Sequence, residues 1–280
     1  MENADRIRLI VHGDDFGLSA AVNRGIWRAW REGILTSASL AANGAAVEEA
    51  CALAAGSELE LGVHLNLTTG WPLRPAAAVP SLVDGSGRFP GKWGMVYRAL
   101  AGQLAPAELA AETTAQFERL AGLGVRFSHM DSHHHLHLLP AVAAVASTAA
   151  KEAGIGWVRR VRGVGESDWQ GSGLIGRLQQ ATLERCSRRC ETVYQGFRSA
   201  DVFFGLSWYL DPGRGNAAHR LVRALHPGCN EWMCHPAHFS SGPAAGSAAA
   251  RRQAECNLLC DPGLRRLLET AGIELTTFEH

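Results

Sequence analysis

The sequence predicts an α/β fold in which parallel strands alternate with helices, as a barrel or a doubly wound sheet. Short apolar runs with β character are separated along the whole chain by longer Ala-, Leu- and Arg-rich stretches with helical spacing. Hydrophobic residues make up 46% of the 280 residues and charged residues 19%, which is enough apolar material for the core of one domain. No repeat and no linker-like change of composition divides the chain, so we expect a single domain over residues 1–280.

The first half of the chain supplies four predicted strands, at residues 6–11, 35–40, 59–67 and 126–131. The helices predicted between and after them cover residues 21–33, 45–55, 106–124 and 140–154. Ser19 is placed to cap the first of these helices with its side-chain oxygen. Pro106 and Pro140 suit the first turns of the last two helices, and Gly124 and Gly154 suit their carboxyl ends.

The second half has further β-like runs, at residues 155–161, 200–206, 229–235 and 272–278. Two long irregular stretches, residues 68–105 and 162–176, are expected to form active-site loops, because loops of this length inside a compact domain are commonly functional. The second stretch contains the spacing Gly171-x-Gly173-x-x-Gly176. It follows polar residues instead of a strand, which argues against a dinucleotide site.

The composition excludes several classes of partner. The 27 basic and 27 acidic residues give no net charge, so no overall field draws the chain to nucleic acid or to an anionic membrane. No run approaches the roughly 18 apolar residues that a membrane span needs, and the first residues do not resemble a secretory leader. The seven cysteines include no C-x-x-C pair, and those at 186/190 and 256/260 fit buried thiols on helices better than a metal clamp. We therefore expect a cytoplasmic protein, and a homodimer is compatible with the sequence.

Acidic and imidazole side chains gather where the predicted strands end. They are Asp14, Asp15, His64, Asp131, His133 and His235. The carboxyl ends of parallel strands lie on one face of an α/β barrel, where active sites are built. One carboxylate and two imidazoles, Asp15, His64 and His133, form a three-ligand set with open positions for water, which is typical of a catalytic metal site. Asp14 is then free to act as general base, and the cation offsets the repulsion between the adjacent acids.

The segment HMDSHHHLHLLP, residues 129–140, permits two interpretations. It is either a surface run that binds metal incidentally or part of the predicted site, and its place between a strand and a helix favours the site. If the segment is extended, His133, His135 and His137 share one side and His134 lies opposite. At most one or two of these histidines can then bind the metal, and the others contact substrate or support the ligands.

Several other residues have alternative structural roles. His235 is either a structural histidine or part of the site, and Glu231, four residues earlier, is placed to orient it. Arg159 is either a surface charge or the partner of a carboxylate. Three aromatic residues of the first loop can stack on a sugar ring, although burial under the loop is the favoured interpretation of each. They are Trp71, Phe89 and Trp93.

Four motifs occur in order along nearly the whole chain: DDFGLSAAVNRGIWRAWREGILTSASL, GVHLNLTTGWPL, HMDSHHHLHLLP and EWMCHPAHF, followed by a terminal GIELTTF. Together they resemble the YdjC-like carbohydrate deacetylases, which include chitooligosaccharide and hopanoid-associated deacetylases. The resemblance implies an irregular (β/α) barrel of the polysaccharide-deacetylase type. It also implies a divalent metal, with zinc expected first and magnesium, cobalt and manganese as alternatives. The implied reaction removes the N-acetyl group from an amino sugar, such as a saccharide or glycoconjugate that contains N-acetylglucosamine.

Carried over by position, the resemblance implies that Asp15, His64 and His133 are the metal ligands. It implies that Asp14 is the base, in agreement with the residue pattern. It adds His235 as the closing-motif histidine, a general acid, and Arg159 as the arginine after the fifth strand. The chain departs from the usual family pattern at His12-Gly13, at Val161 and at Ala237. None of these departures removes a proposed catalytic group, but they leave the identity of the sugar undecided. His12 is placed to support the site or to contact substrate.

Two other functions stay open on the sequence alone. The same metal site could hydrolyse an O-acetyl ester or another amide, or the chain could bind metal or sugar without catalysis. The presence of both Asp14 and His235 argues against binding alone, because binding requires neither residue.

Overall fold

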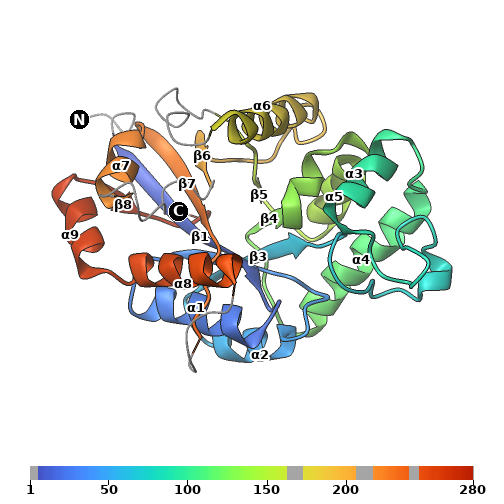
Figure 1. Cartoon of the computed structure of the whole chain (residues 1–280), viewed down its shortest axis with the longest axis horizontal. Helices are drawn as coiled ribbons and strands as arrows, with labels where there is room; N and C mark the ends of the chain where they lie inside the picture. The colour runs from blue at the N-terminus through green and yellow to red at the C-terminus, as the bar shows by residue number, and fades with distance from the viewer. Residues whose placement is uncertain (1–5, 163–172, 206–216, 240–245, 280) are drawn as a thin grey trace.

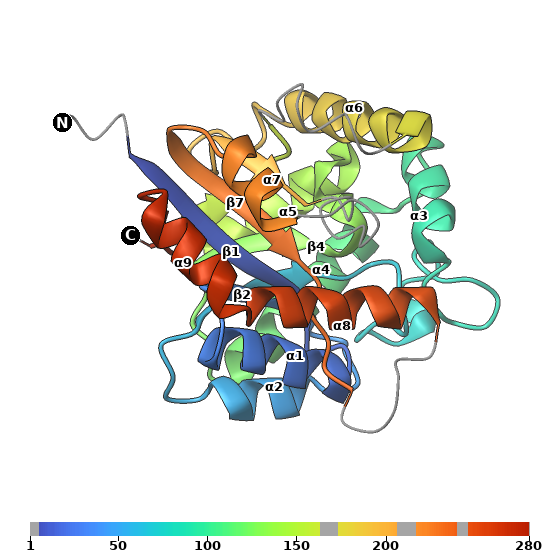
Figure 2. The ribbon, with the colours of Figure 1, turned by 60° about the vertical axis from the view of Figure 1, so that its left-hand side comes forward.

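The computed structural model describes residues 6–162, 173–205, 217–239 and 246–279. Its parallel strands form one curled sheet with helices packed around it, which confirms the predicted α/β barrel (Figure 1, Figure 2). The strand order is β5-β4-β3-β2-β1-β7-β6, and β8 lies beside the first half of β1. The strands are β1 (Ile7–Phe16), β2 (Ser37–Leu40), β3 (Glu60–Leu65), β4 (His129–Ser132), β5 (Trp157–Val158), β6 (Val202–Phe204), β7 (Gly228–Cys234) and β8 (Glu274–Leu275).

The two edge strands, β5 and β6, are short, and the barrel is irregular where they meet. The backbone N–H of Val158 donates to the carbonyl of Arg198 at 3.0 Å, and the N–H of Phe203 donates to the carbonyl of Arg162 at 3.1 Å. Trp157 and Arg198 form an isolated parallel bridge. These few backbone bonds take the place of a regular ladder between the two edges.

Helices cover the outside of the sheet. They are α1 (Ala20–Arg31), α2 (Val47–Ala54), α3 (Gly91–Leu100), α4 (Pro106–Gly122), α5 (Pro140–Glu152), α6 (Gly173–Arg189), α7 (Ala217–Ala224), α8 (Ser247–Leu259) and α9 (Pro262–Thr270), with 3-10 helices η2 (Ala76–Ala78) and η3 (His133–Leu138). Ser19 caps α1 as predicted, since its hydroxyl accepts from the N–H of Val22 at 3.4 Å. In both views α1, α2 and α8 lie together along one side, and α6 lies on the other (Figure 1, Figure 2). Among the described helices, none is long and apolar enough to cross a bilayer.

The first of the two stretches expected to be long loops is not irregular throughout. The stretch 68–105 contains α3, whose Met95 is fully buried. The helical spacing there is obscured in the sequence by Gly91 and Gly94. Residues 163–172 of the second predicted loop lie outside the described residues, and α6 begins directly after them.

Side chains fill the interior of the barrel in layers. Ile10, His12 and Asp14 alternate along β1 and point inward, as expected for every second residue of a strand. Ile10 belongs to an apolar floor that includes Phe278. The ring of His12 lies above that floor, 5.5 Å from the ring of Phe278 and 4.7 Å from that of His129. Carboxylates follow in the layer above, so the polar end of the barrel rests on packed rings.

Candidate active site

The two adjacent aspartates lie on a bulge of β1. In a regular strand neighbouring side chains point to opposite faces, which would separate Asp14 from Asp15. The register of β1 against β2 shifts between Gly13 and Phe16, and Asp15 has a φ of 72°. Residues other than glycine rarely adopt this left-handed conformation, which is found mainly where function requires it. The bulge lets both carboxylates face the interior at the carboxyl end of the barrel.

Asp15, His64 and His133 bring three ligand atoms together. Asp15 Oδ1 lies 2.8 Å from His133 Nδ1 and 3.2 Å from His64 Nε2, and the two nitrogens are 3.4 Å apart. A metal with bonds of about 2.0–2.2 Å holds its neighbouring ligand atoms about 2.8–3.6 Å apart, from octahedral to tetrahedral geometry. Asp15 Oδ1 is buried and accepts no well-directed hydrogen bond from the described residues. The spacing, the donor types and this buried oxygen all fit a divalent cation.

The surroundings of these three residues favour positive charge. Burial alone would lower the pKa of His64, but the charge of Asp131 and hydrogen bonds with Asp131 and Asp15 raise it to about 10. Burial also opposes ionisation of Asp15, but its interactions with His133 and His64 outweigh burial and hold the pKa of its carboxyl well below the usual value. A proton on His64 therefore balances the acids in the metal-free protein, and a divalent cation can replace that proton.

Strand pairing orients His64. The β3–β4 register places it beside Asp131, whose Oδ1 lies 2.8 Å from His64 Nδ1. Ser39 of β2 lies on the same nitrogen, with its Oγ at 3.1 Å. Histidines that bind metal usually have a carboxylate on the other ring nitrogen, which fixes the direction of the ligating one. Here that arrangement turns His64 Nε2 toward Asp15.

The histidine run is not extended, so the alternation considered for an extended segment does not apply. Residues 133–138 form η3, and His134 and His135 have φ values of 58° and 56°. Two consecutive residues in this left-handed conformation turn the chain sharply away from the extended path of a strand. His133 faces Asp15 from the start of this turn, whereas the ring of His134 turns to Thr68, with Nδ1 at 2.9 Å from Oγ1.

The later histidines of the run support the turn. His137 is fully buried, with Nδ1 2.6 Å from Ser132 Oγ and Nε2 2.9 Å from the carbonyl oxygen of Arg159. Burial lowers the pKa of His137 to about 4, which keeps the ring neutral. His135 packs edge-on against Phe203, 5.7 Å between ring centres. His137 therefore holds η3 and the backbone of Arg159, with no exposed surface for a substrate to contact.

Arg159 is a buried partner of carboxylates, so it is not a surface charge. Its Nε donates to Glu231 at 2.6 Å, and NH1 and NH2 donate to the two oxygens of Asp14 at 2.8 and 2.7 Å. NH1 also lies 2.6 Å from Asp131 Oδ2. His12, Asp14 and Asp131 form a second group with metal-ligand spacing, within 4.8 Å of one another. The guanidinium of Arg159 already supplies positive charge to that group.

His235 lies at the mouth of the site, at the end of β7. Its side chain is 32% exposed, and its Nε2 lies 3.9 Å from Asp14 Oδ2. The orienting partner expected from the sequence, Glu231, binds Arg159 instead. Four residues along a strand span about 13 Å, so a residue at that spacing is too far away to orient His235. Glu255 of α8 takes the place expected for Glu231, and its Oε2 accepts the backbone N–H of His235 at 2.6 Å.

The sequence analysis missed Arg252 of α8. Arg252 NH2 donates to Asp15 Oδ2, which leaves Oδ1 to face the two imidazoles. The carbonyl of Arg252 accepts from Ala237 at 3.0 Å and so holds the segment after His235. Helix α1 approaches the same segment closely, since a Cβ on Gly25 would lie 2.4 Å from Ala237 Cα. No local motif marks Arg252, because only the tertiary fold brings α8 to the end of β1.

Known proteins resemble this chain over nearly its full length. The sequence profile of a family described as YdjC-like protein matches residues 8–270. The chain belongs to the YdjC-like family. A carbohydrate deacetylase from Mus musculus is 35% identical to it, over 98% of this chain and 94% of the relative. A chitooligosaccharide deacetylase from Klebsiella pneumoniae (strain 342) is 33% identical, over 96% of this chain and 97% of the relative. The family resemblance of the four motifs is therefore confirmed.

A crystal structure has the same fold as this YdjC-like chain. It is that of a protein from Enterococcus faecalis V583 described as a candidate cellobiose-phosphate cleavage protein. The two share 25% sequence identity, superpose with a TM-score of 0.72, and match over 98% of each chain.

Two loop tryptophans of the YdjC-like chain are exposed. Trp71 is 55% and Trp93 68% exposed, so the favoured burial is wrong for both, whereas Phe89 is buried as expected. Trp71 lines a hollow of about 580 Å³ that also reaches Leu18 and Thr69. These two residues follow β1 and β3, the strands that carry Asp15 and His64, so the hollow lies on the same end of the barrel as the site.

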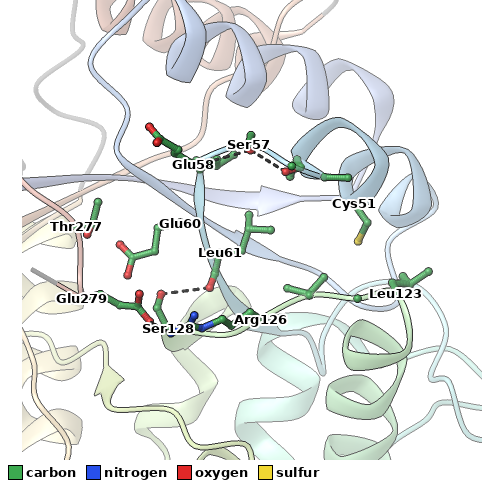
Figure 3. A pocket seen from close by; sticks show the side chains of 16 residues that line it. Cys51, Ser57, Glu58, Glu60, Leu61, Leu123, Arg126, Ser128, Thr277 and Glu279 are labelled. Carbon is green, nitrogen blue, oxygen red and sulfur yellow. Dashed lines mark hydrogen bonds and ion pairs between the residues drawn. The ribbon is translucent and has the colours of Figure 1, made fainter.

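A second hollow, of about 410 Å³, lies at the opposite ends of the strands (Figure 3). Its walls include Glu60 at the start of β3 and Ser128 just before β4, whose hydroxyl donates to the carbonyl of Leu61 at 3.2 Å. The amino-terminal face of a β/α barrel serves stability more often than catalysis, so this hollow is not part of the candidate site.

Proposed function

We propose that this protein is a metal-dependent hydrolase that removes the N-acetyl group from an acetylated amino sugar and releases acetate. The observation that carries the proposal is the ligand-spaced set of Asp15, His64 and His133, with a separate carboxylate, Asp14, beside it. The reaction class is supported by relatives of matching length that are named carbohydrate deacetylase and chitooligosaccharide deacetylase.

The donor set would hold one divalent cation. When bound, such an ion polarises a carbonyl group and lowers the pKa of water from near 16 toward about 7. We propose zinc first, because one carboxylate and two imidazoles are ligands that catalytic zinc sites use. Cobalt, manganese and magnesium are alternatives that reconstitution of the metal-free protein distinguishes.

Asp14 and His235 would move the protons. Arg159 donates to both oxygens of Asp14, which fixes the direction of the carboxylate. Each oxygen retains a lone pair that can accept a proton from the attacking water. His235 is partly exposed, with Nε2 3.9 Å from Asp14 Oδ2, and can donate a proton to the amide nitrogen as the C–N bond breaks. The products are acetate and a free amine.

The hollow beside Trp71 would accept the saccharide. The backbone carbonyl of Trp71 accepts from Asn43 Nδ2 at 2.9 Å, so the loop is tied to the segment after β2. Arg88 lies over the ring, 5.4 Å from its centre. A sugar ring can then stack on an indole whose position is fixed before binding.

The test is hydrolysis of a graded panel of acetylated sugars by the zinc-loaded protein. Acetate and free amine are measured separately, with and without a chelator. We expect equal amounts of acetate and amine from saccharides that contain N-acetylglucosamine, abolished by the chelator. Acetate without amine from O-acetylated sugars would make the protein an esterase on the same site. Stoichiometric zinc binding with no acetate from any substrate would favour a binding protein and overturn the proposal.

A further inference from the structure

His12 is a buried histidine that none of the proposed catalytic steps uses. It lies in the layer beneath the carboxylates, with no exposed surface. Because the ring is inaccessible, it does not contact substrate, and its effect must pass through its neighbours.

Those neighbours form a short chain of hydrogen bonds to a proposed metal ligand. His12 Nδ1 lies 2.8 Å from Ser37 Oγ, and its Nε2 lies 3.1 Å from Ser39 Oγ. Ser39 Oγ lies 3.1 Å from His64 Nδ1, which in turn lies 2.8 Å from Asp131 Oδ1. Ser39 therefore lies between the imidazoles of His12 and His64, and its hydroxyl can donate one hydrogen bond.

One order of protons gives each hydrogen-bonding group of this chain a partner with a metal on His64. A carboxylate accepts and cannot donate, so His64 Nδ1 carries the proton that goes to Asp131, and Nε2 keeps its lone pair for the metal. The hydroxyl proton of Ser39 must then point to His12 Nε2. His12 in turn carries its own proton on Nδ1 and donates it to Ser37.

The nearby carboxylates do not compete for this arrangement. His12 Nε2 lies 3.5 Å from Asp14 Oδ1 and 3.6 Å from Asp131 Oδ2, which is longer than a hydrogen bond. Arg159 NH2 donates to that oxygen of Asp14, and Arg159 NH1 forms an ion pair with that oxygen of Asp131.

We propose that His12 is a positioning residue that takes up the hydroxyl proton of Ser39 and so keeps His64 in the tautomer that can bind a metal. Without an acceptor at position 12, the hydroxyl turns toward His64 Nδ1. That donor then competes with the proton that Nδ1 must keep when the metal displaces the proton of Nε2, and so weakens metal binding. The inference rests on the proposed metal site.

The experiment is a Zn²⁺ titration of the metal-free protein in competition with a chromophoric chelator. His12→Phe fills the space of the ring but offers no acceptor, and we expect it to raise the zinc dissociation constant about 10–100-fold, the usual effect of losing a partner of a metal ligand. His12→Gln keeps an acceptor within reach of Ser39 and should recover most of the affinity.

The decisive variant is the double substitution His12→Phe/Ser39→Ala. Removing the hydroxyl removes the competing donor, so we expect Ser39→Ala alone to bind zinc within about threefold of the natural protein. The double variant should return to the affinity of Ser39→Ala. If His12 had only a structural role, deleting a second polar group would not restore the zinc affinity.

The control for disturbance of the layer is His129→Asn. This substitution removes a neighbouring buried ring whose Nδ1 pairs with Ser128 and whose Nε2 has no hydrogen-bond partner among the described residues, and it should leave zinc affinity unchanged. Thermal unfolding identifies any variant that fails to fold. An unaltered affinity in His12→Phe, or a double variant as weak as His12→Phe, overturns the inference. Zinc binding without deacetylation removes the proposed reaction and leaves this inference standing, whereas absence of zinc binding in the natural protein overturns both.

Discussion

Asp14 and Asp15 are neighbours in sequence, yet the bulge gives them different surroundings. Arg159 holds Asp14 on one side, whereas Asp15 faces the imidazoles of His64 and His133. A carboxylate paired with a guanidinium can accept a proton without being bound to metal, and one between two imidazoles is placed to be a ligand. These contacts support the proposed division of work, with Asp14 as the base and Asp15 as the ligand.

Asp14→Asn should keep zinc and lose turnover. The amide fills the same space and leaves the three ligand residues unchanged, but it cannot accept the proton from water, so we expect kcat to fall about 10²–10⁴-fold. Acetate release and elemental analysis of the purified variant measure the two effects. Asp15→Asn is the matched control and should lose the metal itself. Unchanged turnover in Asp14→Asn would remove the base assignment.

Zinc affinity should rise with pH. The pKa of His64 in the metal-free protein is about 10, so the ring carries a proton at neutral pH and zinc must displace it. Each binding event then releases about one proton from His64, and affinity increases about tenfold per pH unit until the pH passes the pKa of His64. Calorimetry in buffers of different ionisation enthalpy measures the released proton. A dissociation constant that does not change between about pH 7 and 9 would contradict this picture.

Trp71→Ala should weaken substrate binding without slowing the chemical step. Loss of a stacking surface removes about 1–2 kcal/mol of contact, so we expect KM for an oligosaccharide to rise about tenfold with kcat retained. Trp93→Ala is the matched control, because Trp93 is at least as exposed but does not line the hollow. Equal effects of the two substitutions would place the sugar elsewhere.

At the level of elements, helix α8 supports the site from outside the strands. Arg252 binds Asp15, Glu255 binds the backbone of His235, and α1 packs against the segment at Ala237. The position of His235 therefore depends on close packing between α1 and the chain after β7. Gly25 is the point of closest approach, since a Cβ there would overlap the backbone of Ala237.

Gly25→Ala should displace His235 and spare the metal. Overpacking of this kind costs about 1–3 kcal/mol of folding free energy, and the movement should lower kcat because His235 is the proposed acid. Zinc content should stay at that of the natural protein, because the ligands lie on β1, β3 and η3. Gly122→Ala, at a helical glycine with free space around its Cβ position, is the control and should leave kcat and the melting temperature at least as high. Full activity in a folded Gly25→Ala would show that this packing does not position His235.

At the scale of the whole molecule, the alternation of apolar runs and helical stretches predicted parallel strands, in a barrel or a doubly wound sheet, because that pattern depends only on local spacing. The family resemblance narrowed this prediction to the barrel. It also put the acids and histidines at strand ends, and the structure brings them to one end of the sheet. The pattern could not predict the bulge at Asp15 or the left-handed residues of η3, since both depend on backbone conformations with no local signature. Arg252 and Ser39 reach the site only through tertiary packing, so nothing near them in sequence marks them.

The central claim is that one divalent cation binds between Asp15, His64 and His133. An anomalous difference map at the zinc edge, from crystals of the zinc-loaded protein, tests it directly. The predicted result is a single strong peak about 2.0–2.2 Å from Asp15 Oδ1, His64 Nε2 and His133 Nδ1. A peak between His12, Asp14 and Asp131, or no peak within reach of these three ligands, would contradict it.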